Sequence, residues 1–181
     1  MTRIVNDLFL LNELDAGAAG AGAEVDLGAV LRDVAADIKV IQPERPVQVE
    51  AGDGLIVTGD QDRLVQAVTA FTSNALRYTP DGGCIAVGLA RENESIRVSV
   101  TDTGPGIPAE ALSNVFERFY RADQGRARLS DGGGSGLGLA VARSIIEAHG
   151  GRIGAHSPPG QGATFWFSLP VEPPEGPDTF L

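Results

Sequence analysis

The stretch that decides the fold is residues 102–107, which read DTGPGI. It follows directly on a run of apolar residues that predicts a β-strand ending at an Asp-Gly turn. A longer stretch, residues 62–80, precedes it, carries apolar residues at helical spacing and ends in SNALRYTP. A third stretch, residues 134–139, reads GSGLGL and opens a helix. These residue types suggest that the three stretches serve one ligand.

Each stretch supplies a different group that a nucleotide needs. The glycine-rich helix start at residues 134–139 offers backbone N–H groups in a favourable dipole field, which suits phosphate oxygens. Asn74 offers one amide oxygen, a hard ligand that Mg²⁺ can take from a protein while keeping several waters. Asp102 offers an acceptor for an exocyclic amine, and Gly104 and Gly106 allow close backbone approach to a base. The three stretches therefore predict a site for ATP and Mg²⁺.

With these motifs in place, the chain resembles the catalytic ATP-binding domain of bacterial sensor histidine kinases. Four signatures of that family stand here in the family's order: the Asn box that ends at Pro80, the first Gly box at Asp102, the Phe box VFERFYR at residues 115–121, and the second Gly box at Gly134. The closing run GATFWFSLP at residues 162–170 also matches the family's last strand. The resemblance implies an α+β fold of the Bergerat type.

The pattern of expected elements agrees with a two-layer α/β sandwich, in which a mixed, mostly antiparallel sheet carries three main helices on one face. Asp26 and Asp60 are expected to cap the first two helices, and the third begins at about Leu137 and stops before Gly150. Residues 110–119 predict one or two short helices. Strands are expected at residues 47–50, 55–58, 85–90, 96–101, 152–156 and 163–169.

The chain has 181 residues, 43% of them hydrophobic, which is enough for one substantial core. We assign residues 25–170 to the ATP-binding domain. Residues 16–24 are expected to be a flexible Ala/Gly linker, and residues 171–181 a disordered Pro-containing tail. By resemblance, residues 1–15 are the C-terminal remnant of the dimerisation helix. The polar, glycine-rich residues 121–134 are expected to form a mobile loop at the family's ATP-lid position.

Charge and composition exclude several classes of function. The formal net charge of −10 argues against a nucleic-acid groove. The single cysteine, Cys84, leaves no internal disulfide and is read as a small apolar strand residue. No run approaches the roughly 20 apolar residues of a membrane span, and the N-terminus lacks a secretion signal. We expect a cytoplasmic domain, either free or as the cytoplasmic part of a membrane-bound kinase.

The resemblance implies roles for individual residues. Asn74 is the metal ligand, and it forms the catalytic set with Arg77 and Arg121. Arg121 is the better candidate than Arg118 to neutralise charge on the γ-phosphoryl group; the alternative is that the neighbouring aromatic residues only anchor the lid while both arginines are solvated. The nucleotide-binding set is Asn74, Arg77, Tyr78, Asp102, Gly104, Gly106, Ile107, Phe119, Tyr120, Gly134, Ser135, Gly136, Leu137, Gly138, Leu139 and Thr164.

Three assignments are weaker. Thr164 is expected to support the adenine contact through its hydroxyl, with a plain strand residue as the alternative. Arg126 and Arg128 in the lid are further candidates for contacts with phosphate. Of the two histidines, neither of which lies in a phosphoacceptor context, His149 is attributed to the dipole at a helix C-terminus. No role is assigned to His156.

One position departs from the family. Four residues before the metal-binding Asn, the wider superfamily holds a Glu that activates water, and most histidine kinases hold another Asn; here the residue is Ala70. A methyl group cannot accept a proton, so we expect slow ATP hydrolysis. Loss of the second amide also predicts weaker Mg²⁺ binding.

The sequence therefore predicts the donor half of a two-component phosphotransfer reaction. The acceptor would be a histidine on a dimerisation domain, either on a separate polypeptide or in a missing upstream part, with a response regulator as an indirect partner. Two alternatives remain: a serine kinase of the anti-sigma type with the same fold, and a catalytically degenerate adenine-nucleotide sensor that docks through residues 4–11. We expect no nucleic-acid partner and no direct insertion into a membrane.

Overall fold

The computed structural model describes residues 2–15, 22–52, 54–121, 135–158 and 160–171. The helices are α1 (Thr2–Asp15), α2 (Leu27–Ile41), α3 (Gln61–Tyr78), α4 (Ala109–Leu112) and α5 (Gly138–Ala148). The strands are β1 (Ala23–Asp26), β2 (Val47–Ala51), β3 (Ile56–Gly59), β4 (Ile85–Glu92), β5 (Ser95–Asp102), β6 (Arg152–His156) and β7 (Ala163–Pro170). Nearly all of the expected lid and tail, and most of the expected linker, lie outside the described residues.

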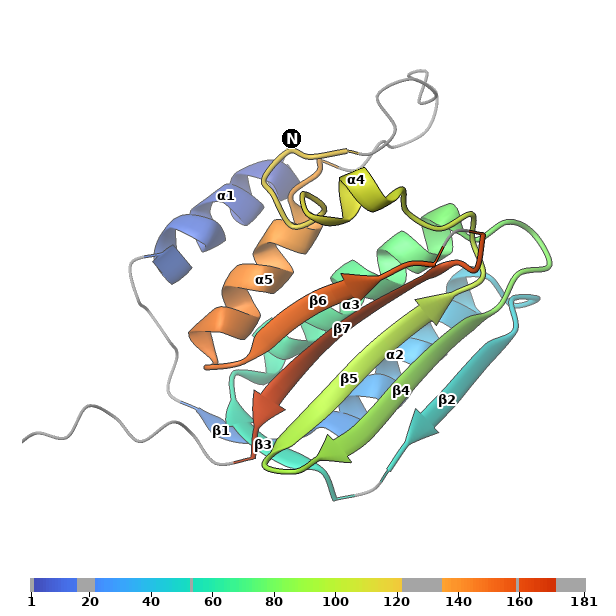
Figure 1. Ribbon diagram of the computed structural model, residues 1–181. Helices are drawn as coiled ribbons and strands as arrows, with labels where there is room; N and C mark the ends of the chain where they lie inside the picture. Colours follow the sequence, from blue (N-terminus) through green and yellow to red (C-terminus); the bar gives the residue numbers. More distant parts are fainter. Residues whose placement is uncertain (1, 16–21, 53, 122–134, 159, 172–181) are drawn as a thin grey trace, which may run out of the picture.

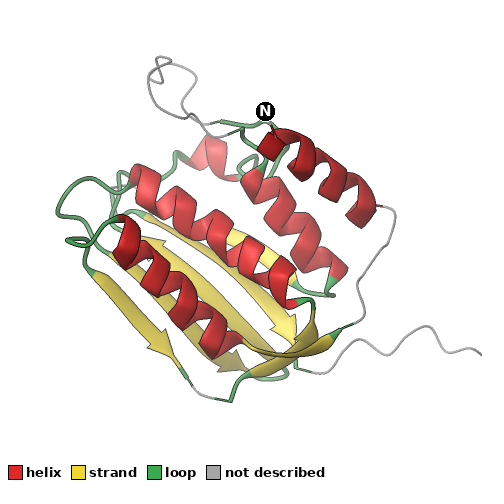
Figure 2. Cartoon of the chain, turned by 180° about the vertical axis from the view of Figure 1, so that it is seen from behind, coloured by secondary structure: helices red, strands yellow, loops and turns green. Residues whose placement is uncertain are grey.

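The main sheet has five strands in the order β2-β4-β5-β7-β6. Strand β2 runs parallel to β4, and the other neighbours are antiparallel. Helices α2, α3 and α5 cover one face of this sheet, as Figure 1 shows from the sheet side and Figure 2 from behind. The expected two-layer α/β arrangement with a mixed, mostly antiparallel sheet is therefore confirmed.

Alternation in the central strands builds the core between the layers. In β5 and β7, every second side chain is buried beneath the helices, as the period of two in a half-covered strand requires. Phe71 of α3 is completely buried, with its ring 5.5 Å from that of Phe165 and 6.0 Å from that of Phe167. This contact holds the helix that carries the Asn box against the strand that follows the β6–β7 turn.

The two shortest strands, β1 and β3, form a separate sheet. Ala23 pairs with Gly59, and Glu24 pairs with Thr58, in antiparallel register. Sequence reasoning placed Ala23 and Glu24 in the flexible linker and did not predict β1. Because neither residue favours strands, the pairing with β3 decides their conformation rather than their own propensity.

Two helix starts follow the capping expected from the sequence. The Asp26 carboxylate accepts the N–H groups of Gly28 and Ala29 at 2.8 and 3.1 Å, and the Asp60 carboxylate accepts that of Arg63 at 3.1 Å. A short polar side chain just before the first helical residue satisfies N–H groups that have no partner within the helix.

His149 makes a contact that the sequence did not predict. Its Nε2 lies 3.0 Å from the backbone nitrogen of Asp60 and accepts that N–H, while its Nδ1 lies 2.7 Å from the carbonyl oxygen of Ile145. The contact with Ile145 lies at the C-terminal end of α5, where the sequence placed this residue, and the contact with Asp60 joins that end to the start of α3.

Helix α1 packs beside α5 (Figure 1). Leu11 is buried in the common core, and Glu13 forms an ion pair with Arg63 of α3 at 3.4 Å. The side chains of Val5 and Phe9 remain exposed, at 63% and 65%. The helical pattern expected for this segment is confirmed, but only part of its apolar surface is covered within the described chain.

Candidate functional site

The site begins with the carboxylate at the end of β5. Asp102 is only 5% exposed, and its Oδ1 accepts the N–H of Gly104 at 2.7 Å. Burial raises the pKa of Asp102 above its ordinary value, and hydrogen bonds from the backbone N–H groups of Gly104 and Ala163 partly oppose this shift. The result is an oriented acceptor that has given up most of its contact with water.

Glycines allow three backbone segments to meet around this carboxylate. A Cβ atom on Gly104 would lie 2.8 Å from the carbonyl oxygen of Tyr78, at the end of α3. Gly162 has a φ of +77°, and a Cβ there would overlap the carbonyl oxygen of Asp102. Only a residue without a Cβ lets these chains approach so closely, so the glycines shape the floor of the site.

Ser157 ties the first Gly box to the turn between β6 and β7. Its Oγ accepts the N–H of Ile107 and donates to the carbonyl oxygen of Gly162, both at 2.7 Å. A Cβ on Gly106, which has a φ of +80°, would lie 2.8 Å from the same Oγ. Sequence reasoning missed Ser157 because no local pattern marks a contact between residues 50 positions apart.

Helix α3 carries Ala70, Asn74 and Tyr78 at intervals of four residues. A Cβ on Gly138, the first residue of α5, would lie 3.9 Å from the Cβ of Ala70. At the other end, the carbonyl of Tyr78 lies against Gly104. Because residues i and i+4 share one face of a helix, the half-buried Asn74 lies on the stripe between the second and first Gly boxes.

The Phe box and the second Gly box meet through their backbones. The N–H of Phe119 donates to the carbonyl oxygen of Gly136 at 3.0 Å. Gly136 has a φ of +71°, and a Cβ there would lie 2.9 Å from the carbonyl carbon of Phe119. Phe119 itself has a φ of 63° and is 59% exposed. Tyr120 is half-buried, and its carbonyl oxygen would also lie near that Cβ, at 3.1 Å.

At the start of α5, not every residue expected to bind phosphate is accessible in the way the sequence suggested. Leu137 is fully buried in the core, so any contact with a phosphate would come from its backbone. Its N–H already donates to the Oγ of Ser135 at 3.3 Å. Gly138 is exposed and Leu139 is half-buried against the core, whereas Gly134 lies outside the described residues.

The arginines are less closely tied to the site. Arg77 is exposed, and its guanidinium lies 5.6 Å from the centre of the Tyr78 ring. Arg121 is half-buried and Arg118 exposed, beside the Phe box. Arg126 and Arg128 lie outside the described residues, so their proposed contacts with phosphate stay predictions.

Thr164 follows Ala163, the register partner of Asp102 on β7. Its register partner is Thr101, next to Asp102, and the two threonine Oγ1 atoms are 2.9 Å apart. His156 pairs with Thr164 from β6 and is exposed. Because successive side chains of a strand point to opposite faces, the Thr101–Thr164 pair and the buried Asp102 carboxylate lie on different faces of the sheet, so the adenine contact expected of Thr164 stays a prediction that the register does not support.

The residues present suit Mg²⁺ bound mainly through phosphate and water. In the described part of the chain, no group of three or more His, Cys, Asp or Glu residues is placed to hold a metal by itself. Asn74 provides a single neutral amide one helical turn from Ala70, the residue that faces Gly138 of α5, and one such ligand matches an ion that keeps several waters and takes few protein ligands.

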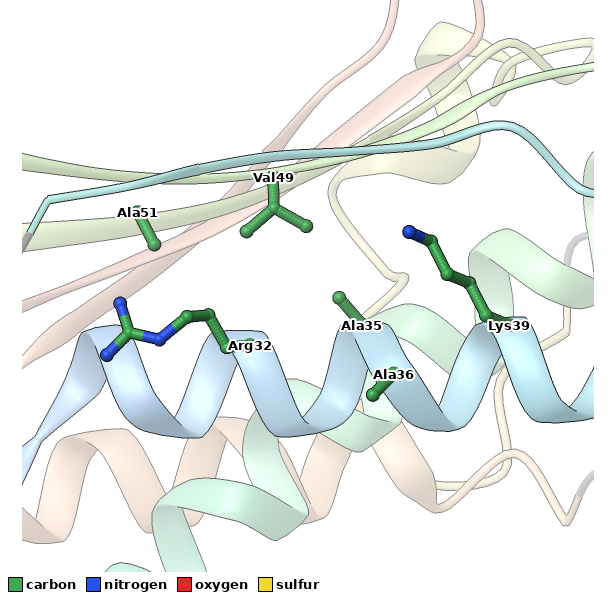
Figure 3. A pocket seen from close by; sticks show the side chains of 6 residues that line it. All are labelled: Arg32, Ala35, Ala36, Lys39, Val49 and Ala51. Atoms are coloured by element: carbon green, nitrogen blue, oxygen red, sulfur yellow. The ribbon is translucent and has the colours of Figure 1, made fainter.

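A separate shallow pocket of about 330 Å³ lies between α2 and the edge strand β2 (Figure 3). It is lined by Arg32, Ala35, Ala36, Lys39, Val49 and Ala51. None of these residues belongs to the four motifs. We therefore do not place the nucleotide in this pocket.

The fold and the glycine-bounded carboxylate define a class: a two-layer α+β domain of ATPase type. Residues 59–173 match the family described as "Histidine kinase-, DNA gyrase B-, and HSP90-like ATPase". Because this match covers more than half of the chain, the chain belongs to that family. In the described residues, no helix has both the length and the apolar character needed to cross a membrane.

Relatives and solved structures agree with this assignment. The chain is 39% identical over 176 residues to the signal transduction histidine-protein kinase BaeS of Escherichia coli. The aligned residues cover 95% of this chain and 37% of BaeS. It also resembles the mycobacterial sensor histidine kinase MprB (TM-score 0.74, 29% identity, 84% of this chain and 100% of that one). Full-length ShkA in complex with AMPPNP gives a TM-score of 0.77 at 30% identity, covering 97% of this chain and 36% of ShkA.

The chain thus spans little more than a third of the length of BaeS and ShkA. The part that it matches is the catalytic ATP-binding domain of sensor histidine kinases, as the resemblance in sequence suggested.

Proposed function

We propose that this domain binds Mg·ATP and transfers the γ-phosphoryl group to a histidine on a dimerisation domain, carried by the same protein or by a separate polypeptide. A response regulator would then receive the phosphoryl group from that histidine. Use of ATP favours a cytoplasmic location. The observation that carries the proposal is the buried Asp102 carboxylate, held by Gly104 and bordered by α3 on one side and by the β6–β7 turn on the other.

In this proposal Asp102 accepts the exocyclic amine of adenine, and Gly104, Gly106 and Ile107 lie along the base. Asn74 supplies the amide oxygen for Mg²⁺. When bound, that ion neutralises charge on the phosphates. Because phosphoryl transfer needs mainly positioning and charge stabilisation, one orienting amide and nearby cations are a sufficient protein contribution.

Arg77 and Arg121 are the candidate cations for the phosphates, and Tyr78, Phe119 and Tyr120 line the approach. The contacts between Phe119 and Gly136 support a shared role, since they join the Phe box to the second Gly box. The backbone at residues 134–139 would face the phosphates.

Ala70 supports a protein side chain, rather than water, as the acceptor. Its position on α3, 3.9 Å from a Cβ built on Gly138, is next to the expected phosphate-binding segment. With a methyl group there, no base is available at this position to activate water. The proposed domain therefore retains ATP until a histidine is presented.

Phosphotransfer with labelled ATP tests this proposal. We expect γ-labelled ATP to leave the isolated chain unlabelled and to label an added histidine-bearing hairpin, with the label lost in acid. Asn74→Ala and Asp102→Ala should abolish the transfer. Acid-stable label on the partner would instead indicate a serine kinase, and nucleotide binding without transfer to any hairpin would indicate a sensor.

The role of Ala70 can be tested by restoring the missing amide. Ala70→Asn would add a second oxygen ligand beside Gly138, so we expect half-maximal transfer at a lower Mg²⁺ concentration. Ser73→Asn is the matched control, because it adds the same group at an exposed position of the same helix. Equal responses of the two variants to Mg²⁺ would contradict a metal role for this face of α3.

A further inference from the structure

Arg45 is a buried cation that no motif identifies. It lies between α2 and β2 and is 8% exposed. Its Nε donates to Oε1 of Gln42 at 2.7 Å. One terminal nitrogen donates to the carbonyl oxygens of Pro80 and Gly83 at 2.5 and 3.1 Å, and the other to that of Thr79 at 3.2 Å. The guanidinium thus holds three backbone carbonyls that directly follow the Asn-box helix.

These carbonyls lie just beyond the C-terminal end of α3, which ends at Tyr78. That end carries partial negative charge, which favours a nearby cation, and the carbonyls of the connection that follows need donors of their own. A guanidinium can serve several of them at once because its donors form a rigid planar fork, which a lysine cannot reproduce. Without Arg45, the carbonyls of Thr79 and Gly83 would lose this donor, and that of Pro80 would keep only the N–H of Gly83, at 3.0 Å.

The clamped segment connects the two motifs of the proposed site. Helix α3, which carries Asn74, runs directly into Thr79, whose hydroxyl donates to the carbonyl oxygen of Ala75. Beyond the clamp, Cys84 donates its N–H to Oγ1 of Thr103 at 2.9 Å and accepts the N–H of Thr103 at 3.2 Å. Residues 79–84 therefore set the distance between the Asn box and the first Gly box.

We propose that Arg45 is a positioning residue of the nucleotide site. By fixing the carbonyls of Thr79, Pro80 and Gly83, it holds the end of α3 against Gly104, the glycine that orients Asp102. It touches neither nucleotide nor metal, and it acts through the backbone. The inference rests on the proposed function, because it concerns the same pocket for Mg·ATP.

If Arg45 only stabilised the fold, its removal would lower the free energy of unfolding of the domain but would not weaken ATP binding by the folded protein. The chain offers a matched control at the other end of α3, where His149 accepts the N–H of Asp60 at 3.0 Å. His149→Ala removes a long-range hydrogen bond from the same helix, far along the chain from the Asn box. It should destabilise the domain and leave nucleotide affinity unchanged.

The experiment compares wild type, Arg45→Met, Arg45→Lys and His149→Ala in the chain as it stands. Urea unfolding gives the stability of each protein, and calorimetry with ATP and ADP in Mg²⁺ gives the affinity at a temperature where all are folded. We expect Arg45→Met to weaken ATP binding about tenfold or more, Arg45→Lys to weaken it less, and His149→Ala to stay within about twofold of wild type.

Hydrogen exchange without nucleotide supplies an independent readout. We expect Arg45→Met to accelerate exchange of the Cys84 and Gly104 amides, whereas His149→Ala accelerates that of Asp60. If Arg45→Met does not fold, Arg45→Lys decides: a fully folded lysine variant with wild-type affinity and exchange overturns the proposal.

The two proposals fail in different ways. Lack of ATP binding by wild type would reject the proposed function. ATP binding by wild type that Arg45→Met and His149→Ala reduce equally, or that neither reduces, would reject the role of Arg45 and leave the function standing.

Discussion

Replacing Gly162 by alanine tests whether the close approach of β7 to Asp102 shapes the site. Gly162 has a φ of +77°, and its new Cβ would overlap the carbonyl oxygen of Asp102 and lie 2.8 Å from the carbonyl carbon. Both contacts are with backbone, which cannot rotate away as a flexible side chain would. The strand end that carries Asp102 must therefore move.

Two contributions determine how much Gly162→Ala should destabilise the domain. A non-glycine residue in the left-handed region costs about 1–2 kcal/mol, and forcing extra atoms into a packed site costs about 1–3 kcal/mol. Gly160→Ala is the matched control, because Gly160 has a φ of +71° and nothing lies within 4 Å of its Cβ position. Both variants lose the same freedom in the unfolded chain. We therefore expect Gly162→Ala to be less stable than Gly160→Ala by about 1–3 kcal/mol.

Urea unfolding of the two variants measures this difference, and calorimetry with ATP measures its effect on the site. Gly162→Ala should also bind ATP more weakly than Gly160→Ala under conditions where both are folded, since Asp102 is displaced. Equal free energies of unfolding for the two variants, within about 0.5 kcal/mol, would refute the steric argument. A destabilised Gly162→Ala with normal affinity would instead separate this contact from nucleotide binding.

Two further predictions concern Asp102 and Ser157 in the same site. Burial raises the folded-state pKa of Asp102 above 3.8, so its contribution to stability is present below about pH 3.8 and is lost as the pH rises through the folded value. Adenine binding has the opposite dependence on pH, because only the ionised carboxylate accepts the amine. Calorimetry should show that ATP affinity falls as the pH drops, and that this fall begins at a pH above the ordinary pKa of an Asp side chain. An affinity that does not change with pH would contradict the acceptor role. Ser157→Ala should lower the free energy of unfolding by about 1–3 kcal/mol, because the N–H of Ile107 and the carbonyl of Gly162 lose their partner. An exposed-site control, Ser113→Ala, should stay within about 0.5 kcal/mol of wild type, and equal losses would argue against the Ser157 bridge.

Local patterns predicted most of the elements. Alternation identified β5 and β7, helical spacing identified α3, and single aspartates marked the starts of α2 and α3. Each of these signals is contained within a few consecutive residues, because helices and strands repeat over two to four positions. The same signals put Asp102 at the end of its strand before any tertiary contact was known.

Other features had no local signal. Strand β1 has little strand propensity and exists through its pairing with β3. The hydrogen bond between His149 and Asp60 could not be predicted because the two residues are 89 positions apart in sequence. Arg45 looks in sequence like an ordinary surface cation beside prolines. The proposed ligand contacts of Arg77 and Arg121 stay predictions, because no contact in the described residues tests them.

The sequence by itself determined the order of helices and strands, the residue types of the motifs and the family, because these depend on periodicity and on chemistry carried by neighbouring residues. Only the tertiary structure decided what holds the motifs together: Gly162 against Asp102, Ser157 against Ile107, and Arg45 across the end of α3. These contacts join residues tens of positions apart. Their geometry depends on how the whole sheet and its helices pack, which no short stretch of sequence specifies.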